Sequence, residues 1–447
     1  MYFKQTISFV RLILPGIFLQ ISTVLFSQNP ICPEGIYFAD PSAHVWENGK
    51  LYLYGSLDES KDYYCSRKHV VMETSDMKTW TVHDNSFFSA GKNDQVPYND
   101  ELLYAPDCAF RNDTFFLYYC QPDRKNAEGV AYSLKPEGPF INGQALNLPD
   151  FQEIDPSLFI DDDGQAYYLW GQFSLKMAKM GDNMRDLEFS SFKDSIITES
   201  AHYFHEGAFL TKRNGMYYLV YADISRSGMP TCIGYSTATN PFGPYTYGGV
   251  IIDNDNCDPG NWNNHGSIVE FNKTWYVFYH RATHGSTMMR RACVEPISFL
   301  ADGSIPEVEM TSQGAGGPLK ASKKIEAEYA CLLHGNIQVN SDAKQKLFLT
   351  NIKSGDKAAF KYIDFENGVK KITIRYLPGS QGSSVTLGID NPWQNQIASI
   401  QIAPKTQRKE WTTQTFDVSS VTGIHTLWLQ FWGDQGERVS IDWFFFE

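Results

Sequence analysis

Five short aromatic strands recur along the first 300 residues of this 447-residue chain. Each follows a polar turn, and successive strands start roughly 50–65 residues apart, the spacing of one supersecondary unit per repeat. The five segments are residues 49–54, 113–119, 164–170, 215–221 and 273–279. This regular recurrence indicates a supersecondary repeat and not chance β-propensity.

A matching triplet opens a second short strand before each of these turns. β-Hairpins repeating at this length, with no amphipathic helix between them, predict an all-β fold: a β-propeller with one four-stranded blade per repeat. A β-sandwich or two stacked barrels is the alternative, but neither explains why the same opening recurs. The triplets are Asp40-Pro41-Ser42, Ala105-Pro106-Asp107, Asp155-Pro156-Ser157, Glu206-Gly207-Ala208 and His265-Gly266-Ser267.

The first residues of the triplets are expected to form a ring. The innermost strand of each propeller blade lines the central channel, so equivalent repeat positions converge on the axis. Carboxylates packed together raise one another's pKa, and such a cluster usually indicates chemistry. Two carboxyl groups in different ionisation states are the arrangement of glycoside hydrolysis, while a calcium site made of oxygen ligands is the alternative. The predicted ring is Asp40, Ala105, Asp155, Glu206 and His265.

Composition narrows the classes of partner. The chain has 38 basic and 51 acidic residues and a formal net charge of −13, which argues against nucleic acid. Aromatic residues make up 15% and charged residues 20%, so the chain can bury a large core. None of the eight cysteines forms a C-x-x-C motif or another metal-ligand spacing, and we expect no organic cofactor and no zinc or redox chemistry.

The N-terminal segment is predicted to direct export. Met1–Ser27 carries Lys4 followed by the apolar stretch Ile7–Phe26, which is typical of a cleaved secretory signal. A membrane anchor is the alternative, but no other segment approaches the roughly 20 apolar residues of a spanning helix. We therefore expect a secreted or periplasmic protein without a membrane span in its mature form.

Several motifs together resemble glycoside hydrolase family 43. They are Ala39-Asp40-Pro41, Ile154-Asp155-Pro156-Ser157, His205-Glu206-Gly207-Ala208, Asn264-His265-Gly266 and the stretch Arg290–Glu295. The resemblance covers Cys32–Leu319 and implies a five-bladed propeller and an inverting mechanism. It also implies roles for four residues: Asp40 as general base, Glu206 as general acid, Asp155 as modulator of the acid's pKa, and His265 as the residue that organises a hydrated cation, usually calcium, in the channel.

Further substrate-binding residues are suggested by their positions. Aromatic faces suit stacking on a sugar ring, and Trp170, Phe204 and Trp262 lie near the channel-facing openings, although packing between blades is the alternative for each. Arg290 is near the position where the family often places a substrate-binding arginine. Arg291 is an equal candidate for that role.

A second unit is expected after a Gly- and Pro-rich linker at Thr311–Pro318. The roughly 125 residues that follow contain alternating strands and are long enough for an independent β-sandwich. We therefore predict a signal peptide at residues 1–27, a propeller at 32–318 and a sandwich at 323–447.

The second unit resembles a family 6 carbohydrate-binding module. The resemblance rests on Ile325-Glu326-Ala327-Glu328 and on Ser440–Phe444. It implies a structural calcium held by Glu326, Glu328 and Asp442, and a place for Trp411 in a sugar-binding cleft. A rigid structural annex without sugar binding remains the alternative.

The expected function is that of a secreted, inverting, exo-acting glycosidase that removes pentose residues from plant polysaccharide. α-L-Arabinofuranosyl side chains are the first expectation, and β-xylosidase, arabinanase and exo-galactanase activities are alternatives within the same family. A non-catalytic glycan-binding propeller and a metal-stabilised adhesion propeller are alternatives of other classes. We expect a monomer.

Overall fold

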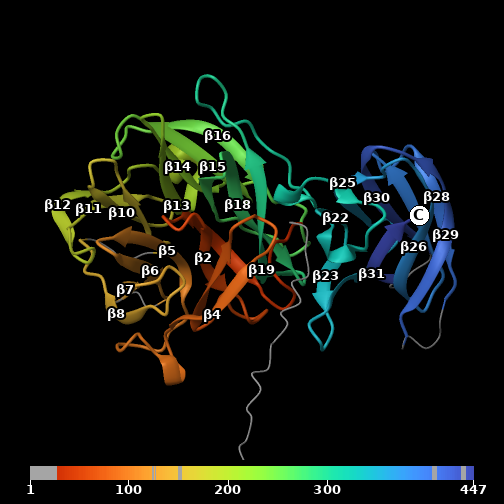
Figure 1. The fold of residues 1–447 in the computed structure, drawn as a ribbon, viewed down its shortest axis with the longest axis horizontal. Coiled ribbons are helices and arrows are strands. Elements are labelled where there is room, and N and C mark those ends of the chain that lie inside the picture. Colours follow the sequence, from red (N-terminus) through yellow and green to blue (C-terminus); the bar gives the residue numbers. More distant parts are fainter. Residues whose placement is uncertain (1–27, 123–124, 126, 150–153, 405–409, 434–438) are drawn as a thin grey trace, which may run out of the picture.

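The computed structural model of the protein describes residues 28–122, 125, 127–149, 154–404, 410–433 and 439–447. The predicted signal peptide, residues 1–27, lies outside these residues. Figure 1 shows two β-rich units side by side, the larger built from the N-terminal two thirds of the chain.

Five antiparallel sheets make up the larger unit, and four of them have four strands each in the order of the chain. The first is β1 (Phe38–Val45), β2 (Leu51–Leu57), β3 (Lys68–Thr74) and β4 (Thr81–Phe88). The second is β5 (Tyr104–Arg111), β6 (Thr114–Cys120), β7 (Glu128–Ser133) and β8 (Ile141–Ala145). The third is β9 (Ser157–Ile160), β10 (Ala166–Trp170), β11 (Lys176–Met180) and β12 (Leu187–Lys193). The fourth is β13 (Phe204–Arg213), β14 (Met216–Asp223), β15 (Cys232–Ala238) and β16 (Thr246–Asp253).

The fifth sheet differs from the other four. It has three strands, β17 (Ser267–Phe271), β18 (Thr274–Thr283) and β19 (Ser286–Ile297). The N-terminal residues of the described chain run along β19, where the Ile31 amide donates to the Ala292 carbonyl at 2.9 Å. The segment around Ile31 thereby joins the last blade, and this contact ties the two ends of the propeller together.

The blades form a closed ring. The innermost strands β1, β5, β9, β13 and β17 contact one another in this order, and β17 returns to β1. The predicted aromatic segments form the second strand of each blade. The prediction of a five-bladed propeller is confirmed, with a three-stranded fifth sheet as the one departure from the expected four strands.

Two predicted substrate-binding aromatics prove to be core residues, which corrects the prediction for both. Trp170 is fully buried and packs against Tyr168 and Phe192, with ring centroids 5.7 and 5.8 Å away. Phe204 is fully buried and packs edge-on against Tyr221. Both side chains pack in the propeller core, where burying a large aromatic contributes most to stability.

The C-terminal unit is a sandwich of two six-stranded sheets, as predicted. One sheet contains β20 (Leu319–Lys320), β22 (Leu332–His334), β25 (Lys357–Asp364), β27 (Ser383–Ile389), β28 (Gln396–Ile402) and β30 (Ile424–Gly433). The other contains β21 (Ile325–Glu326), β23 (Gln338–Ser341), β24 (Leu347–Thr350), β26 (Val369–Pro378), β29 (Thr412–Val421) and β31 (Val439–Phe446). A single apolar core drawn from both sheets lies between them.

The predicted linker packs against both units. The Thr311 hydroxyl donates to Glu295 of the propeller at 2.7 Å, and the Ser312 amide donates to the Lys361 carbonyl of the sandwich at 2.6 Å. A second backbone contact joins Leu333 to Asn256 at 2.7 Å. The two units are therefore held by direct hydrogen bonds rather than by a free tether.

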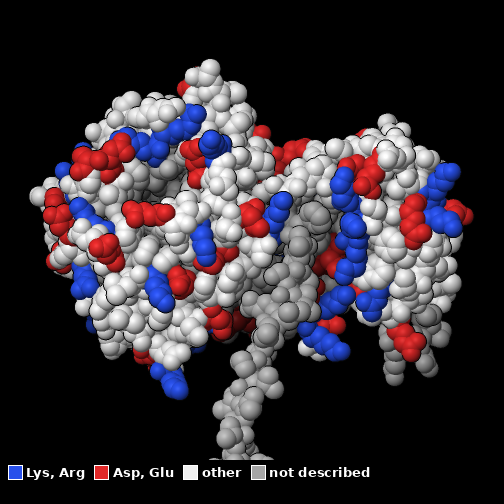
Figure 2. Space-filling view, in the orientation of Figure 1, with Lys and Arg blue, Asp and Glu red and all other residues white. Residues whose placement is uncertain are grey.

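Helical structure is limited to short turns among the described residues: α1 (Glu199–His202), η1 (Gly91–Asn93), η2 (Gly314–Gly316) and η3 (Ala327–Tyr329). None of them is long and apolar enough to cross a membrane. All eight cysteines are buried and unpaired. Figure 2 shows acidic and basic side chains interspersed over the propeller face in view.

Replacing Trp170 by Ala tests its role in the core. We expect the free energy of unfolding of the propeller to fall by about 3–5 kcal/mol, the usual cost of a large aromatic-to-alanine change in a core. Urea unfolding followed by circular dichroism measures the change, with Trp393→Ala as control because Trp393 is 60% exposed. A Trp170→Ala protein of unchanged stability would contradict this assignment.

Candidate active site

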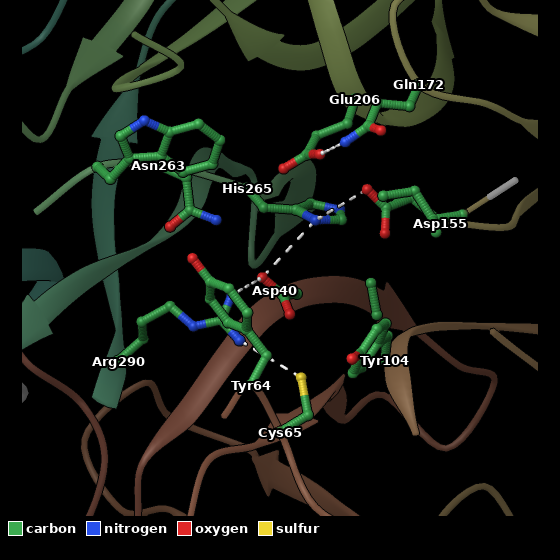
Figure 3. A pocket seen from close by; sticks show the side chains of 13 residues that line it. Asp40, Tyr64, Cys65, Tyr104, Asp155, Gln172, Glu206, Asn263, His265 and Arg290 are labelled. Carbon is green, nitrogen blue, oxygen red and sulfur yellow. Dashed lines mark hydrogen bonds and ion pairs between the residues drawn. The ribbon is translucent and has the colours of Figure 1, made fainter. Parts of the chain in front are cut away.

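A cavity of about 300 Å³ opens at the end of the central channel. It is lined by all five residues of the predicted ring, one from each blade or from the residues just before its inner strand. Figure 3 shows the Asp40, Asp155, Glu206 and His265 side chains directed toward one another. The remaining lining residues are Tyr64, Cys65, Tyr104, Ile154, Gln172, Trp262, Asn263 and Arg290.

Local backbone irregularities aim these side chains. The pairing of inner and second strands is interrupted between Ala39 and Ser42 and between Glu206 and Phe209. Such bulges reorient a side chain at the end of a strand. At Gly207 the backbone has φ of +69°, and an added Cβ would lie 2.9 Å from the His265 ring. Glycine is therefore required directly after Glu206.

Asp40 is held as a carboxylate. Its Oδ1 accepts a hydrogen bond from Arg290 Nη1 at 2.8 Å, and its Oδ2 accepts one from the Ser56 hydroxyl at 2.6 Å. Burial opposes ionisation, but Arg290 and the neighbouring His280 and His265 outweigh it and hold the pKa of Asp40 well below its usual range. Asp40 is thus an ionised group poised to accept a proton.

Glu206 has the opposite tendency. The residue is 8% exposed, and its Oε2 accepts a hydrogen bond from Gln172 Nε2 at 2.8 Å. Burial raises the pKa of Glu206, and nearby His205 and the bond from Gln172 offset this only in part. Glu206 therefore tends to keep its proton.

Asp155 shares this tendency. Burial, together with the charges of Glu206 and Asp40, raises the pKa of Asp155 well above its usual range. Since Glu206 and Asp155 influence each other, their proton belongs to the pair. The pocket thus combines one ionised carboxylate with a pair of carboxyl groups that tends to hold a proton, the combination needed for a base and an acid.

His265 lies between two of the carboxyl groups. Its Nδ1 is 3.7 Å from Asp40 Oδ1 and 3.8 Å from Asp155 Oδ2. Burial lowers the pKa of His265 to about 4, so the ring is neutral at ordinary pH. The described residues contain no group of three or more His, Cys, Asp or Glu placed to bind a metal ion. A calcium ion at His265 would have to be held through water, and it stays a prediction.

The three predicted calcium ligands of the sandwich are not gathered into one such group in the described chain. Asp442 instead pairs with Arg375 at 2.5 Å and with Lys346 at 3.1 Å, and Glu326 pairs with Lys324. Glu328 is buried, and burial raises its pKa to about 8. Each of the three carboxyl groups also keeps one buried oxygen without a hydrogen-bond partner among the described residues, namely Glu326 Oε2, Glu328 Oε2 and Asp442 Oδ1. A calcium ion held by these residues stays a prediction.

Of the two candidate arginines, Arg290 and Arg291, only Arg290 faces the pocket, because side chains alternate along β19. Arg290 lies in the pocket, where it also forms a two-pronged pair with Asp58, both contacts at 2.9 Å. Neighbouring residues of a strand face opposite ways. Arg291 accordingly points away and donates to the Cys32 carbonyl at 2.6 Å.

Only one of the three predicted propeller aromatics lines the pocket. Trp262 is 39% exposed there and packs edge-on against His205. Trp411, the predicted aromatic of the sandwich, lies against Phe348 and under the Arg375 guanidinium. Sugar binding at Trp411 stays a prediction.

Asp107 is a structural residue whose role sequence reasoning did not recognise. It occupies the third position of its triplet and is 2% exposed. Its carboxylate accepts hydrogen bonds from Ser42 at 2.6 Å and Ser157 at 3.1 Å, and from the Leu158 amide at 2.7 Å. His44 Nε2 lies 2.6 Å away. Since Ser42 and Ser157 follow Asp40 and Asp155 by two positions, Asp107 joins the strands that carry both.

Other residues that line or support the pocket were not identified by the repeat. Asp58, Tyr64 and Gln172 lie in loops between strands, and no spacing in the sequence distinguishes them. His280 closes the fifth aromatic strand, and its Nδ1 accepts a hydrogen bond from the Asp40 amide at 3.3 Å. Only the folded loops reveal these partners.

Comparison with known proteins agrees with this geometry. Residues 27–305 match the model of glycosyl hydrolases family 43, and residues 326–447 match that of carbohydrate binding module family 6. A "Xylosidase/arabinosidase" of Thermoclostridium stercorarium is 28% identical over 91% of this chain and 96% of its own. An "Arabinoxylan arabinofuranohydrolase" of Paenibacillus polymyxa is 25% identical over 93% of this chain and 74% of its own.

A solved structure is similar as well. The β-xylosidase/α-arabinofuranosidase CoXyl43 from a compost microbial metagenome, a calcium-free form in complex with xylotriose, is 30% identical with a TM-score of 0.53. It covers 62% of this chain and 96% of its own. The propeller and its carboxylate pocket are those of a glycoside hydrolase. The chain belongs to glycosyl hydrolases family 43 and carries a C-terminal carbohydrate-binding module of family 6.

Replacing Asp107 by Asn tests its role in joining the inner strands. The amide keeps the shape but presents two donors to groups that already donate, so we expect a loss of about 1–3 kcal/mol in the free energy of unfolding. Thermal unfolding at constant pH measures it. Asp182→Asn is the control, since the Asp182 side chain is 96% exposed and should shift stability by less than about 0.5 kcal/mol. Equal stabilities of the two variants would refute the role of Asp107.

Proposed function

We propose that this protein is a secreted, inverting exo-glycosidase that releases pentose residues, first of all α-L-arabinofuranosyl side chains, from plant polysaccharide. The observation that carries this proposal is the pocket itself, in which an ionised Asp40 faces the Glu206–Asp155 pair, whose pKa values are both raised. An inverting glycosidase needs one carboxylate to activate water and one carboxylic acid to protonate the leaving oxygen.

In this mechanism Asp40 is the general base. The Arg290 and Ser56 contacts keep it ionised and orient it, so that it can take a proton from the attacking water. Glu206 is the general acid and donates its proton to the glycosidic oxygen, with Gln172 orienting the carboxyl. Asp155 is assigned as the pKa modulator of this acid, because the charge of Glu206 acts on Asp155 and the two groups titrate together. Arg290 and Trp262 would contact the sugar.

Exo action is supported by the size of the cavity. At about 300 Å³ it lies at the lower end of the range for small-molecule sites, which suits one sugar ring rather than several. The arabinofuranosidase preference is supported by the name of the Paenibacillus polymyxa relative, whose similarity extends over 93% of this chain and so includes the module. A non-catalytic glycan-binding propeller would have no need for carboxyl groups with opposed pKa shifts.

β-Xylosidase activity is the second candidate. It is favoured by the name of the Thermoclostridium stercorarium relative and by the similar CoXyl43 structure. The export of the chain, its monomeric state and calcium in the channel or the module belong to the same proposal as expectations carried by the sequence.

A substrate screen with product analysis tests the reaction class. We expect hydrolysis of 4-nitrophenyl α-L-arabinofuranoside and of arabinoxylan, and proton NMR of the first-formed sugar should show inversion at the anomeric carbon. Aryl xylosides and galactosides serve as comparison substrates. Retention of configuration would refute the inverting mechanism, and hydrolysis of xylosides alone would transfer the proposal to the second candidate.

Glu206→Gln tests the acid and its pH dependence. Because Glu206 must be protonated and its pKa is raised, wild-type kcat/KM should fall as pH rises through that pKa, while Asp40 stays ionised well into the acidic range. The variant should lose about 10²–10⁴-fold in kcat on substrates with poor leaving groups and should lose the alkaline limb of the profile. Glu307→Gln, a surface carboxylate change, is the control. An unchanged rate would refute the role of Glu206.

A further inference from the structure

A second cavity, of about 550 Å³, lies where the propeller meets the carbohydrate-binding module. We call it the interdomain groove. Propeller residues form one wall and the β23–β24 hairpin of the module forms the other. Its volume lies within the range of roughly 300–1,000 Å³ that is usual for cavities that bind small molecules. The residues used below are Tyr37, Asp58, Lys61, His284, Asn340 and Gln345.

The module wall is held in place by the loop between β18 and β19. The His284 amide donates to the Val339 carbonyl at 2.7 Å, and His284 Nε2 lies 3.3 Å from both the Ser341 hydroxyl and the Tyr37 hydroxyl. Gln338 packs so closely on Gly285 that an added Cβ would lie 2.2 Å from its amide. The position of the hairpin is therefore determined by direct contact with the propeller.

The groove and the catalytic pocket lie on two sides of one loop. This loop, residues 58–67, connects β2 with β3. Asp58 lines the groove and pairs with Arg290, which lines the pocket. Tyr64, from the same loop, also lines the pocket, and Tyr63 is 40% exposed. One loop thus supplies lining residues to both cavities, so that the groove adjoins the pocket across this loop.

The groove offers hydrogen-bonding groups that are not used by the protein. Among the described residues, the Asn340 and Gln345 side-chain amide nitrogens and Lys61 Nζ make no hydrogen bond to another group. Elsewhere in the lining, Lys68 is neutralised by Asp84 at 2.6 Å. Amide and ammonium N–H donors without a partner are suited to the hydroxyl oxygens of a sugar.

We propose that the interdomain groove binds main-chain sugar units of the same polysaccharide whose side-chain sugar enters the catalytic pocket. This inference rests on the proposed function. The module would then act as one wall of an extended substrate cleft, contributing binding energy far from the reacting bond. Asn340 and Gln345 would supply this contact from the module, and Lys61 would supply it from the propeller.

The double substitution Asn340→Ala/Gln345→Ala tests the groove. Loss of one or two sugar hydrogen bonds should lower kcat/KM on arabinoxylan by about three- to tenfold, chiefly through KM. The rate on 4-nitrophenyl α-L-arabinofuranoside should stay unchanged, because this substrate is too small to leave the pocket. Gln396→Ala is the matched control, an exposed amide on β28 of the same module.

Substrates of graded length give the second readout. On arabinose-substituted oligosaccharides, kcat/KM of the wild type should rise with main-chain length, and the double variant should flatten this rise. An unchanged length dependence would overturn the proposal. An equal fall in kcat/KM of the double variant on the polymer and on the aryl substrate, together with a lower melting temperature, would also overturn the proposal. It would show that the groove residues serve only to hold the two units together.

Failure of the groove and failure of the proposed function give different results. If the wild type cleaves aryl arabinofuranosides but the double variant matches it on every substrate, only the groove is refuted. If the wild type cleaves no aryl arabinofuranoside or xyloside, the proposed function fails. Affinity electrophoresis in arabinoxylan gels then tests the groove alone, and equal retardation of wild type and double variant would refute it.

Discussion

The closed ring of the five innermost strands is the constraint on which the rest of the structure depends. The ring brings the five triplet openings, spread over more than 200 residues of sequence, to one end of a single channel. Two features keep it closed: the segment around Ile31 pairs with the last blade, and Asp107 joins strands of neighbouring blades. Without this closure the carboxyl groups would lie on separate hairpins and could not share a proton.

Crowding carboxyl groups in a buried pocket costs free energy, and the three groups differ in how their charge is compensated. Asp40 alone receives a direct arginine contact, and Arg290 is itself balanced by Asp58. Glu206 and Asp155 lack such a partner in the described chain, and their raised pKa values favour a proton shared by the pair. This asymmetry, rather than the number of acids, distinguishes a base from an acid within one ring, and it follows from which residue lies next to Arg290.

The carbohydrate-binding module is packed directly against the propeller. Its hairpin rests on the loop that follows β18, next to the loop that separates the groove from the catalytic pocket. Family membership alone does not determine this arrangement, because a propeller and a sandwich can be joined in many ways. Here the packed residues Thr311 and Ser312 restrict how the units sit.

Local signals in the sequence determined the repeated hairpins, the residue of each repeat that faces the channel, and the strands of the sandwich. They could do so because turn residues and alternating apolar residues act over only a few positions. Those signals placed Asp40, Asp155, Glu206 and His265 in one pocket. They could not separate stacking aromatics from core aromatics, and Trp170 and Phe204 proved to be buried. They also could not show which arginine faces the channel or that Asp58 and Gln172 support the pocket. Nor did they indicate that the Arg375 side chain pairs with Asp442 of the module. These features depend on contacts between loops and blades far apart in the chain, and only the tertiary structure decides them.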